Sequence, residues 1–385
     1  MRSKISLGSV VVTGLLSSFV SAVAFADAPA PKWYDTIAMS GYLQGSYVAN
    51  LNDPASKTNT DRQFDTNSDS FNFNTFLLQI AKPVGDSDHY GFTVRLRTGQ
   101  DANNLPGGGN LTVQEAYMTY VIPQMTKLSL IGGKFVTPEG YEGVDTVNNP
   151  NFSEGLLFTF AEPITHTGIK ANYMINDKAN ATIGVVNGWD VAPDNNDAKT
   201  ILWQLATTPT KQISWSFQGL YGKELPDPTH SQRLSLDTVL GVNPTDKLSF
   251  NLQGNWGEQT NDPGTAAGEG TTHWDGLGFW ASLATTSKFT EIARFEVLND
   301  QNGADRFNVV DPGTSTPRTP RTFADGTTNQ TVKEFTLTHK TMLTASLGNR
   351  LEYRHDWSNE AYFEKSDGSF VRNQNTISTD FFVLF

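Results

Sequence analysis

Charged side chains are the residues of this sequence that point most clearly to chemistry, and they form two sets. Acids crowd one irregular segment and are Glu139, Glu142, Asp145 and Glu154. Bases fall on the polar positions of alternating segments and are Arg95, Arg97, Lys170, Arg294, Arg350 and Arg354. Opposed acids and bases across a narrow aqueous gap make a transverse field that orients dipolar solutes and sorts ions. The alternative is solvated acids and wall salt bridges, such as Arg350 with Glu352.

Three single residues carry open alternatives. His166 could make the function pH-sensitive, because an imidazole titrates near neutrality, or it could simply hydrogen-bond to its surroundings. Trp280 could stack on a sugar, whereas most Trp residues of such a chain belong to interfacial girdles. Lys134 shares an apolar phase with Leu128 and Leu130. This position would make Lys134 face lipid. Alternatively, a bulge at Gly132 and Gly133 would turn the side chain inward, or Lys134 would lie at the outer rim and extend its ammonium group into water.

Signals for catalysis, cofactors and metals are weak. The sequence around Ser153 reads NFSEG, with Asn151 where a nucleophile elbow requires glycine. There is no HExxH motif, and the glycines at 107–109 do not open a helix. The acid–Asn run at 194–197 lacks EF-hand spacing. We therefore expect no enzyme, no cofactor and no metal. The net charge of −12 argues against nucleic acid as a partner.

The first 26 residues have the composition of a cleaved signal peptide. Arg2 and Lys4 precede an apolar stretch from Ile5 to Val23, and Ala24-Phe25-Ala26 offers small residues at a cleavage site. Removing this segment changes the formal charge from −12 to −14, since two bases and no acid are lost. We expect residues 27–385 to form one domain. The chain has no cysteine, so no disulfide stabilises it.

Apolar and polar residues alternate with a period of two through the whole remaining chain. In 213–221, for example, Ile213, Trp215 and Phe217 alternate with Ser214 and Ser216. No run of 18 apolar residues follows the signal segment, which excludes a transmembrane helix. Repeated alternating segments of about ten residues are typical of an outer-membrane β-barrel, whose lipid-facing and lumen-facing residues alternate.

Connections between these segments alternate between seven short and eight long ones, which gives sixteen antiparallel strands. The predicted strands are 37–49, 71–82, 89–99, 111–122, 127–135, 163–175, 179–189, 200–208, 212–222, 233–243, 247–257, 274–286, 289–299, 331–341, 343–355 and 373–385. The same parity places 136–162 in one long third loop, because a strand at 155–161 would put the loop at 190–199 on the wrong side.

The final strand is the most specific local feature. Ile377, Thr379, Phe381, Val383 and Phe385 share one face and end on an aromatic carboxy-terminus. This resembles the terminal strand of outer-membrane proteins, which the barrel-assembly machinery reads. We expect a Gram-negative outer-membrane protein surrounded by lipid and lipopolysaccharide.

The middle of the chain resembles the OmpL-like "putative beta-barrel porin-2" family. The resemblance rests on GGKFVTPEGYEGVD (132–145), NFSEGLLFTFAEPITHTGIKANY (151–173) and VVNGWD (185–190). QEAYMTYVIP (114–123) and LEYRHD (351–356) also look like family strands. The resemblance is strong over about 111–200. It implies a porin-type barrel whose third loop folds inward, as in general porins, but it implies no particular solute. The long loop at 300–330, with its TSTPRTPRTF run, and the polar, mobile segment expected at 57–70 depart from the family and could cover the mouth.

We therefore expect passive diffusion of small hydrophilic solutes and ions with a weak cation preference. The alternatives are a substrate-specific channel for sugars, peptides or phosphorylated solutes, an outer-membrane lipase or protease, and a non-channel surface protein. An energised importer is disfavoured, because the chain is too short for a plug and twenty-two strands. A homotrimer is the usual assembly of general porins, although the sequence shows no interface signature.

Overall fold

Sixteen long strands and a few short elements make up the structure, which is a computed structural model describing residues 33–226, 230–262, 270–301 and 329–385. The long strands are β1 (Ala38–Asn50), β2 (Ser70–Lys82), β3 (Tyr90–Thr98), β4 (Leu111–Val121), β5 (Leu128–Val136), β6 (Thr165–Asn176), β7 (Ala179–Val186), β8 (Thr200–Thr210), β9 (Ile213–Gly222), β10 (Gln232–Thr245), β11 (Leu248–Asp262), β12 (Gly270–Ala284), β13 (Phe289–Gln301), β14 (Gln330–Met342), β15 (Leu347–Ser358) and β18 (Asn373–Leu384). The expected signal segment 1–26 and most of the loop at 300–330 lie outside the described residues.

The remaining elements are short. Strands β16 (Phe363–Glu364) and β17 (Phe370–Val371) form a separate small hairpin. The helical turns are η1 (Trp33–Thr36), α1 (Gln100–Asn103), η2 (Thr146–Asn148) and η3 (Leu157–Ala161). Among the described residues, no helix is long and apolar enough to cross a membrane. Residues 157–161 thus form a helical turn rather than a strand, as the loop parity predicted.

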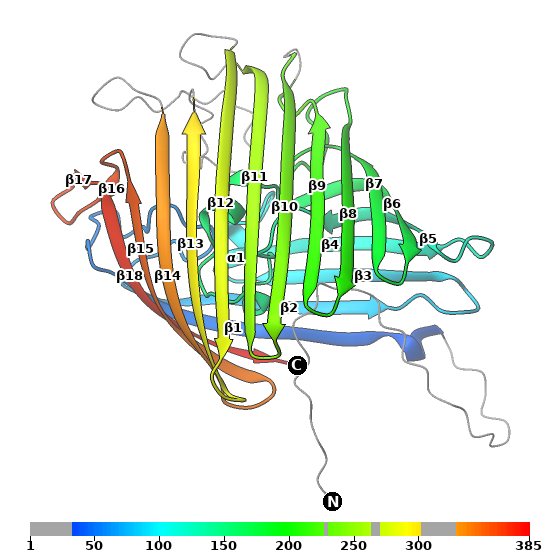
Figure 1. Ribbon diagram of the computed structural model, residues 1–385, viewed down its shortest axis with the longest axis horizontal. Coiled ribbons are helices and arrows are strands. Elements are labelled where there is room, and N and C mark those ends of the chain that lie inside the picture. Colours follow the sequence, from blue (N-terminus) through cyan, green and yellow to red (C-terminus); the bar gives the residue numbers. More distant parts are fainter. Residues whose placement is uncertain (1–32, 227–229, 263–269, 302–328) are drawn as a thin grey trace, which may run out of the picture.

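The sixteen long strands close into one antiparallel barrel in the order β1-β18-β15-β14-β13-β12-β11-β10-β9-β8-β7-β6-β5-β4-β3-β2. The predicted sixteen-stranded up-and-down barrel is confirmed. Short turns join the strands at one end and longer connections at the other, which we call the short-turn end and the long-loop end. In Figure 1 the front strands β8–β15 run top to bottom and β1–β5 cross behind them, as tilted strands of a closed barrel must.

The barrel closes between its first and last strands. Tyr42 lies opposite Leu384, and the pairing continues to Asn50 opposite Thr376. The Gly41 N–H donates to the Phe385 carbonyl (2.8 Å), and the Phe385 N–H donates to the Gly41 carbonyl (3.0 Å). The terminal residue therefore completes the closing ladder, which leaves the sheet without a free edge.

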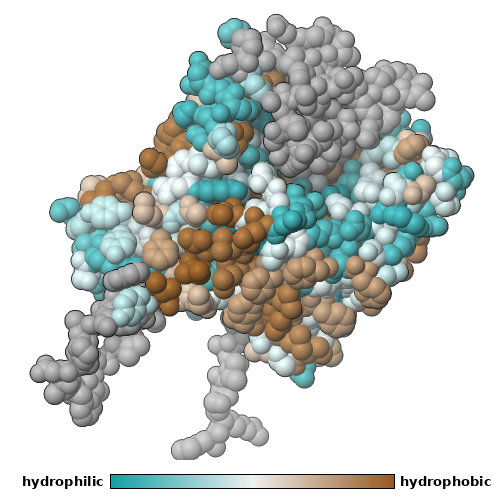
Figure 2. All heavy atoms as spheres, turned by 180° about the vertical axis from the view of Figure 1, so that it is seen from behind, coloured by the Kyte–Doolittle hydropathy of each residue, from teal (hydrophilic) through white to brown (hydrophobic). Residues whose placement is uncertain are grey.

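Side chains alternate between the two faces of the wall, as the sequence predicted. On β13, Arg294, Glu296 and Leu298 point inward and are buried, whereas the intervening Phe295 is exposed. Outward residues are mostly apolar, and Figure 2 shows them as a brown band across the rear of the barrel with hydrophilic residues at its edges. This arrangement matches a surrounding of lipid.

Two bulges add polar groups to the inner face near the long-loop end. In β2, Asn74 is the extra residue between the pairs Gln44–Thr75 and Gly45–Phe73. In β4, Gln114 is the extra residue between Arg95–Glu115 and Leu96–Val113. Such a bulge re-aims a side chain. Gln114 is fully buried and donates to Asp145 of the loop between β5 and β6.

Candidate functional site

The third loop, residues 137–164, leaves β5 and returns to β6, but its hydrogen bonds reach strands on the other side of the barrel. The Gly140 N–H donates to Asp237 of β10 (3.2 Å), and the Tyr141 N–H donates to Gln253 of β11 (3.0 Å). The Phe152 N–H donates to Glu352 of β15 (2.7 Å). All three wall partners are buried and occupy inward positions of their strands. The loop is thus held against the inner face of β10–β15.

Glu142 is bound by a base and by neutral donors. The Arg294 Nη1 donates to Glu142 Oε1 (2.7 Å), and the Trp280 Nε1 donates to the same oxygen (3.2 Å). The Gly155 N–H donates to Glu142 Oε2 (2.6 Å). Arg294 also donates to Glu334 (2.9 Å) and is fully buried. This predicted acid and this predicted base are therefore in direct contact, with no aqueous gap between them.

Asp145 contacts the opposite side of the wall. The Arg97 Nη2 donates to its Oδ1 (2.8 Å), and Arg95 donates to its other oxygen. Burial alone would raise the pKa of the Asp145 carboxyl, but the charges of Arg95 and Arg97 outweigh burial and lower that pKa. The carboxylate is accordingly kept ionised and neutralised by its partners, which ties the loop to β3.

Three alternate residues of β15 hold the loop backbone. Arg350 donates to the carbonyls of Thr146 (2.8 Å) and Asn151 (2.6 Å), and Arg354 Nη1 donates to the carbonyl of Glu154 (2.5 Å). Between them, Glu352 accepts the loop N–H groups. The salt bridge between Arg350 and Glu352, named as an example of the alternative, does not form. Arg350 pairs with Asp380 of β18 (2.7 Å), and Glu352 accepts hydrogen bonds from the loop.

The other loop acids accept hydrogen bonds from neutral donors. Glu139 accepts from the Ser235 hydroxyl (2.8 Å), and Glu154 accepts from the Asn149 amide (3.5 Å). Glu162, which the sequence did not single out, accepts from the Gln253 amide (3.0 Å). Burial, together with neighbouring carboxylates, raises the pKa of Glu154 and of Glu162 well above the usual value. These two carboxyls therefore keep their protons at pH values at which an exposed glutamate is ionised.

Lys170 differs from the predicted arginines. Its Nζ lies 4.1 Å from the centroid of the Phe135 ring. Among the ion pairs of the described residues, none involves Lys170. It is also only half-buried, and so is Arg95, whereas Arg97, Arg294, Arg350 and Arg354 are buried. Of the predicted bases, these two are therefore the ones that reach the accessible part of the interior.

The accessible inner surface lies between the third loop and the short-turn end. Its half-buried inward residues are mostly small and polar, and include Asn172, Thr182, Gln204, Ser216, Asn251, Ser282 and, as a second lysine, Lys340. At the long-loop end the inward residues are almost all buried under loops. The barrel thus has a polar vestibule on one side of the loop layer.

The remaining single residues have defined surroundings. The His166 Nδ1 lies 2.9 Å from the Gly188 carbonyl, and its Nε2 lies 3.3 Å from the Thr137 hydroxyl. Trp280 is buried against the third loop, with its ring 4.8 Å from that of Tyr141. Lys134 keeps the outward register of Leu130, and its Nζ donates to the Val113 carbonyl (3.0 Å). No bulge interrupts that pairing, so Lys134 lies at the outer rim.

The first loop, residues 51–69, supplies site residues that the sequence did not reveal. Arg62 donates to both carboxylate oxygens of Asp356 on β15 (3.2 and 2.9 Å) and is buried. Phe64 packs in a cluster with Leu105, Val144 and Phe158 of the second and third loops. The expected mobility of 57–70 is wrong, because burial of this ion pair and of Phe64 fixes the segment. A basic and an aromatic residue within a polar loop were the only signal available.

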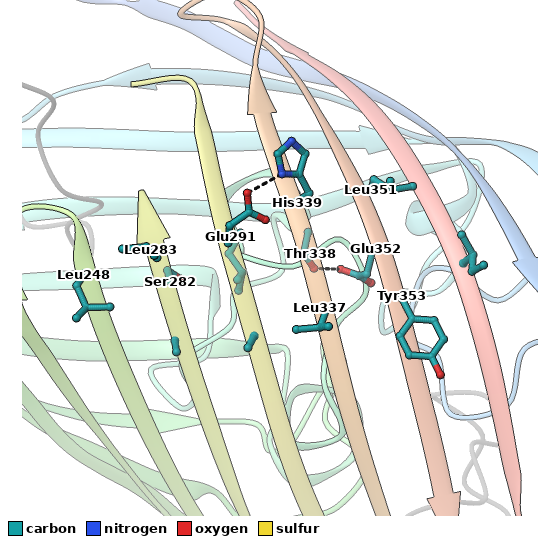
Figure 3. A pocket seen from close by; sticks show the side chains of 14 residues that line it. Leu248, Ser282, Leu283, Glu291, Leu337, Thr338, His339, Leu351, Glu352 and Tyr353 are labelled. Atoms are coloured by element: carbon teal, nitrogen blue, oxygen red, sulfur yellow. Dashed lines mark hydrogen bonds and ion pairs between the residues drawn. The ribbon is translucent and has the colours of Figure 1, made fainter. Parts of the chain in front are cut away.

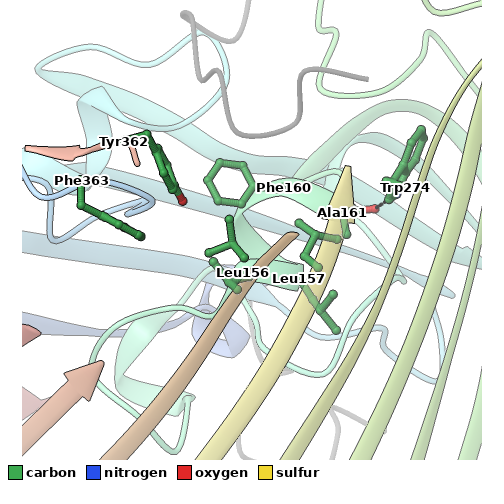
Figure 4. Packing of buried hydrophobic residues seen from close by; sticks show 9 residues of the cluster. Leu156, Leu157, Phe160, Ala161, Trp274, Tyr362 and Phe363 are labelled. Carbon is green, nitrogen blue, oxygen red and sulfur yellow. Dashed lines mark hydrogen bonds between the residues drawn. The ribbon is translucent and has the colours of Figure 1, made fainter. Parts of the chain in front are cut away.

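A second apolar cluster lies under the last loop, residues 359–372. Leu156, Leu157 and Phe160 of the third loop pack with Trp274 of β12 and with Phe363 of the last loop, as Figure 4 shows. The Trp274 Nε1 donates to the Ala161 carbonyl (3.3 Å). The first, third and last loops therefore form one packed layer. In the described part of the chain, no three His, Asp or Glu side chains are placed to hold a metal ion.

Comparison with known proteins agrees with this architecture. The model of the family described as "Putative beta-barrel porin-2, OmpL-like" matches residues 36–385. No functionally curated protein matches the chain in sequence. Solved structures with a similar fold include the anion-selective porin of Comamonas acidovorans, with a TM-score of 0.61, 9% identity and coverage of 91% of this chain and 99% of that one.

Two further solved structures share the fold. The trimer form of OmpT of Vibrio cholerae has a TM-score of 0.59 and 10% identity, covering 91% of this chain and 99% of that one. The outer membrane channel DcaP of Acinetobacter baumannii has a TM-score of 0.58 and 10% identity, covering 91% and 97%. The family match spans nearly all of the barrel, so the chain belongs to the OmpL-like beta-barrel porin-2 family of outer-membrane channels.

Proposed function

We propose that this porin lets small hydrophilic solutes and ions diffuse passively across the outer membrane, with a weak preference for cations. The observation that carries the proposal is the polar vestibule beneath the third loop, lined by half-buried Ser, Thr, Asn and Gln residues. Such a surface offers water and solutes hydrogen bonds without a deep binding pocket. A fold and family of channels, rather than of enzymes, support the same conclusion.

The excess of acidic over basic residues in the chain supports the cation preference. Glu142 and Asp145 are neutralised by arginine, so they contribute little to the net field of the pore. Glu139, Glu154 and Glu162 have hydroxyl or amide donors among their contacts, and the raised pKa of the last two reduces their charge. The preference should therefore be weak, since local charge at the narrowest point decides selectivity.

Single-channel recording in planar bilayers tests the proposal. Folded, heat-modifiable protein is expected to form ohmic channels whose reversal potential in a salt gradient has the sign of a modest cation preference. Absence of conductance from such protein would contradict the channel function. Conductance that a particular sugar, peptide or phosphorylated solute blocks at low concentration would instead support the substrate-specific alternative. An inverted reversal potential would contradict only the cation preference.

The surroundings of the channel are part of the proposal. We expect export with cleavage after Ala26, recognition of Phe385 by the barrel-assembly machinery, and lipopolysaccharide around the long-loop end. A homotrimer is the expected assembly, and the trimeric form known for OmpT of Vibrio cholerae makes it worth testing in mild detergent.

A further inference from the structure

We propose that the outer wall carries a binding site for an amine-headed phospholipid, at a hollow near the short-turn end that extends over β11 to β15 and reaches Ile377 of β18. The hollow has a volume of about 530 Å³, and most of its lining residues occupy outward positions. Figure 3 shows it from close by, with Glu291 and His339 joined across neighbouring strands above Leu283 and Leu337. This site lies on the opposite face of the wall from the vestibule.

Two alanines make the floor of the hollow. Ala281 of β12 and Ala293 of β13 lie directly opposite each other in the sheet, and Ala293 lies opposite Leu337 of β14. In the next outward row toward the long-loop end, Phe279 and Phe295 face each other and are exposed. Small residues beside a row of large ones leave a depression in the outer surface.

An acid–histidine pair forms the other border. Glu291 lies opposite His339, and the His339 Nδ1 is 2.8 Å from Glu291 Oε1. Their side chains are 49% and 42% exposed on the outer face, so both can meet a ligand. Glu291 is the third residue of β13, close to the turn 285–288. A carboxylate in the middle of a lipid-facing wall is costly, whereas near the interface its cost falls to about 0–1 kcal/mol.

Polar groups at the short-turn end and an apolar floor deeper in the wall match the polar headgroup and the acyl chains of a phospholipid. The Glu291 carboxylate, at headgroup level, fits an ammonium group. Lys288 and Lys247 lie exposed in the two adjacent short turns, where they can meet a phosphate. The alanine floor then lies deeper, at the level of the acyl chains. Short turns face the periplasm in such barrels, and the leaflet on that side is made of phospholipid.

Selectivity should come from the headgroup rather than from the acyl chain. The acyl chains of the surrounding lipids are as apolar as the hollow. Burying an acyl chain in the hollow therefore gains only packing contacts. The carboxylate distinguishes phosphatidylethanolamine from phosphatidylglycerol, which has no ammonium group. This complementarity of charge favours a lipid over a second copy of the chain as the occupant.

The test uses the mature protein purified in mild detergent, with bound phospholipid counted by native mass spectrometry. Phosphatidylethanolamine and phosphatidylglycerol with identical acyl chains are the two probes. The wild-type protein should bind the amine lipid preferentially. Ala293→Phe, which fills the hollow, should abolish this bound lipid, and Glu291→Gln should reduce the preference about two- to fivefold, the range of an exposed ion pair.

Matched controls exist on the same outer wall. Glu258 and His273 form a similar outward acid–histidine pair at 3.5 Å toward the long-loop end, so Glu258→Gln should leave lipid preference unchanged. Ala171→Phe places the same bulk on the outward face of β6 and should also have no effect. Unaltered heat-modifiability shows that each variant is folded.

Three outcomes would overturn the site. The first is equal binding of both lipids by the wild-type protein, and the second is undiminished binding by folded Ala293→Phe. The third is a photo-crosslinker in place of Leu337, which also lines the hollow, that captures another copy of the chain instead of lipid. That result would make the hollow a protein interface. None of these outcomes bears on whether the barrel conducts, so the channel proposal stands or falls separately.

Discussion

Glu142 and Arg294 lie 2.7 Å apart inside the barrel, with the Glu142 carboxylate on the third loop and the Arg294 guanidinium on the wall. The acids of the loop and the bases of the wall were expected to lie on opposite sides of an aqueous gap. Here they are in contact and buried, so they serve first as an anchor that fixes the loop. This relationship underlies the stability and conductance predictions below.

Replacing Arg294 should destabilise the protein strongly. Arg294→Gln leaves Glu142 and Glu334 buried without their shared base, and breaking a buried pair costs about 3–5 kcal/mol. The midpoint temperature of the heat-modifiable transition measures the loss. Adding Glu142→Gln should restore part of it, whereas Lys333→Gln, on an outward position of β14, should leave the midpoint unchanged. A wild-type midpoint for Arg294→Gln would show that the anchor contributes nothing.

Removing Lys170, one of the two vestibule lysines, should raise the cation preference. Lys170 has no carboxylate partner among the described ion pairs, so its charge acts on passing ions. Lys170→Gln should move the reversal potential in a salt gradient modestly toward the cation value, while Lys178→Gln in a short turn should not. Glu139→Gln should move it in the opposite direction. If both vestibule and loop variants behave like the wild type, the constriction lies elsewhere.

The packing of the first loop should depend on pH. Burial, partly opposed by the Tyr362 hydrogen bond, raises the pKa of Asp61 to about 7. Because the pKa of Asp61 is higher in the packed loop than in the unfolded chain, protonated Asp61 favours the packed loop. This contribution to stability is fully present below the pKa of the unfolded chain and is lost as the pH rises through about 7. Proteolysis of residues 51–69 should therefore be slower at pH 5 than at pH 8. Asp61→Asn should remove the difference; a difference that persists would assign it to another group.

Gly155 should not tolerate a side chain. A Cβ there would overlap Glu296 Oε2, the oxygen that accepts the Leu156 N–H. Gly155→Ala should cost about 1–3 kcal/mol, the usual range for overpacking, and lower the midpoint of the heat-modifiable transition. Gly109→Ala is the control, because its Cβ would meet nothing within 4 Å. Equal midpoints for the two variants would contradict the close fit of the third loop.

Phe385→Ala should separate assembly from stability. The Phe385 ring is 56% exposed and, within the described ranges, its one ring contact is with Phe76, with the ring centroids 5.9 Å apart. Its backbone bonds to Gly41 do not need the ring, so protein refolded in detergent should lose at most about 1 kcal/mol. Its amount in the outer membrane of cells should fall severalfold. Normal assembly in cells would show that the terminal ring is not read.

Sequence alone determined the barrel and nearly all of its strands. The period of two is a local property, and it survives in any sheet that is polar on one face and apolar on the other. The lengths of the connections then fixed the number and direction of the strands, from β1 at Ala38 to β18 at Asn373. Even the inward position of Arg294 and Arg350 follows from register, because neighbours along a strand must face opposite sides.

Partners inside the barrel were decided only by the tertiary structure. Arg62 binds Asp356, which is 294 residues away in the sequence. Arg350 pairs with Asp380 rather than with Glu352, which is nearer in the sequence. No local sequence pattern predicts these pairs, because they depend on how the barrel closes and on which loop backbone packs against the wall. The physical reason is burial: once the loops fill the long-loop end, each charge must find a partner inside or remain uncharged.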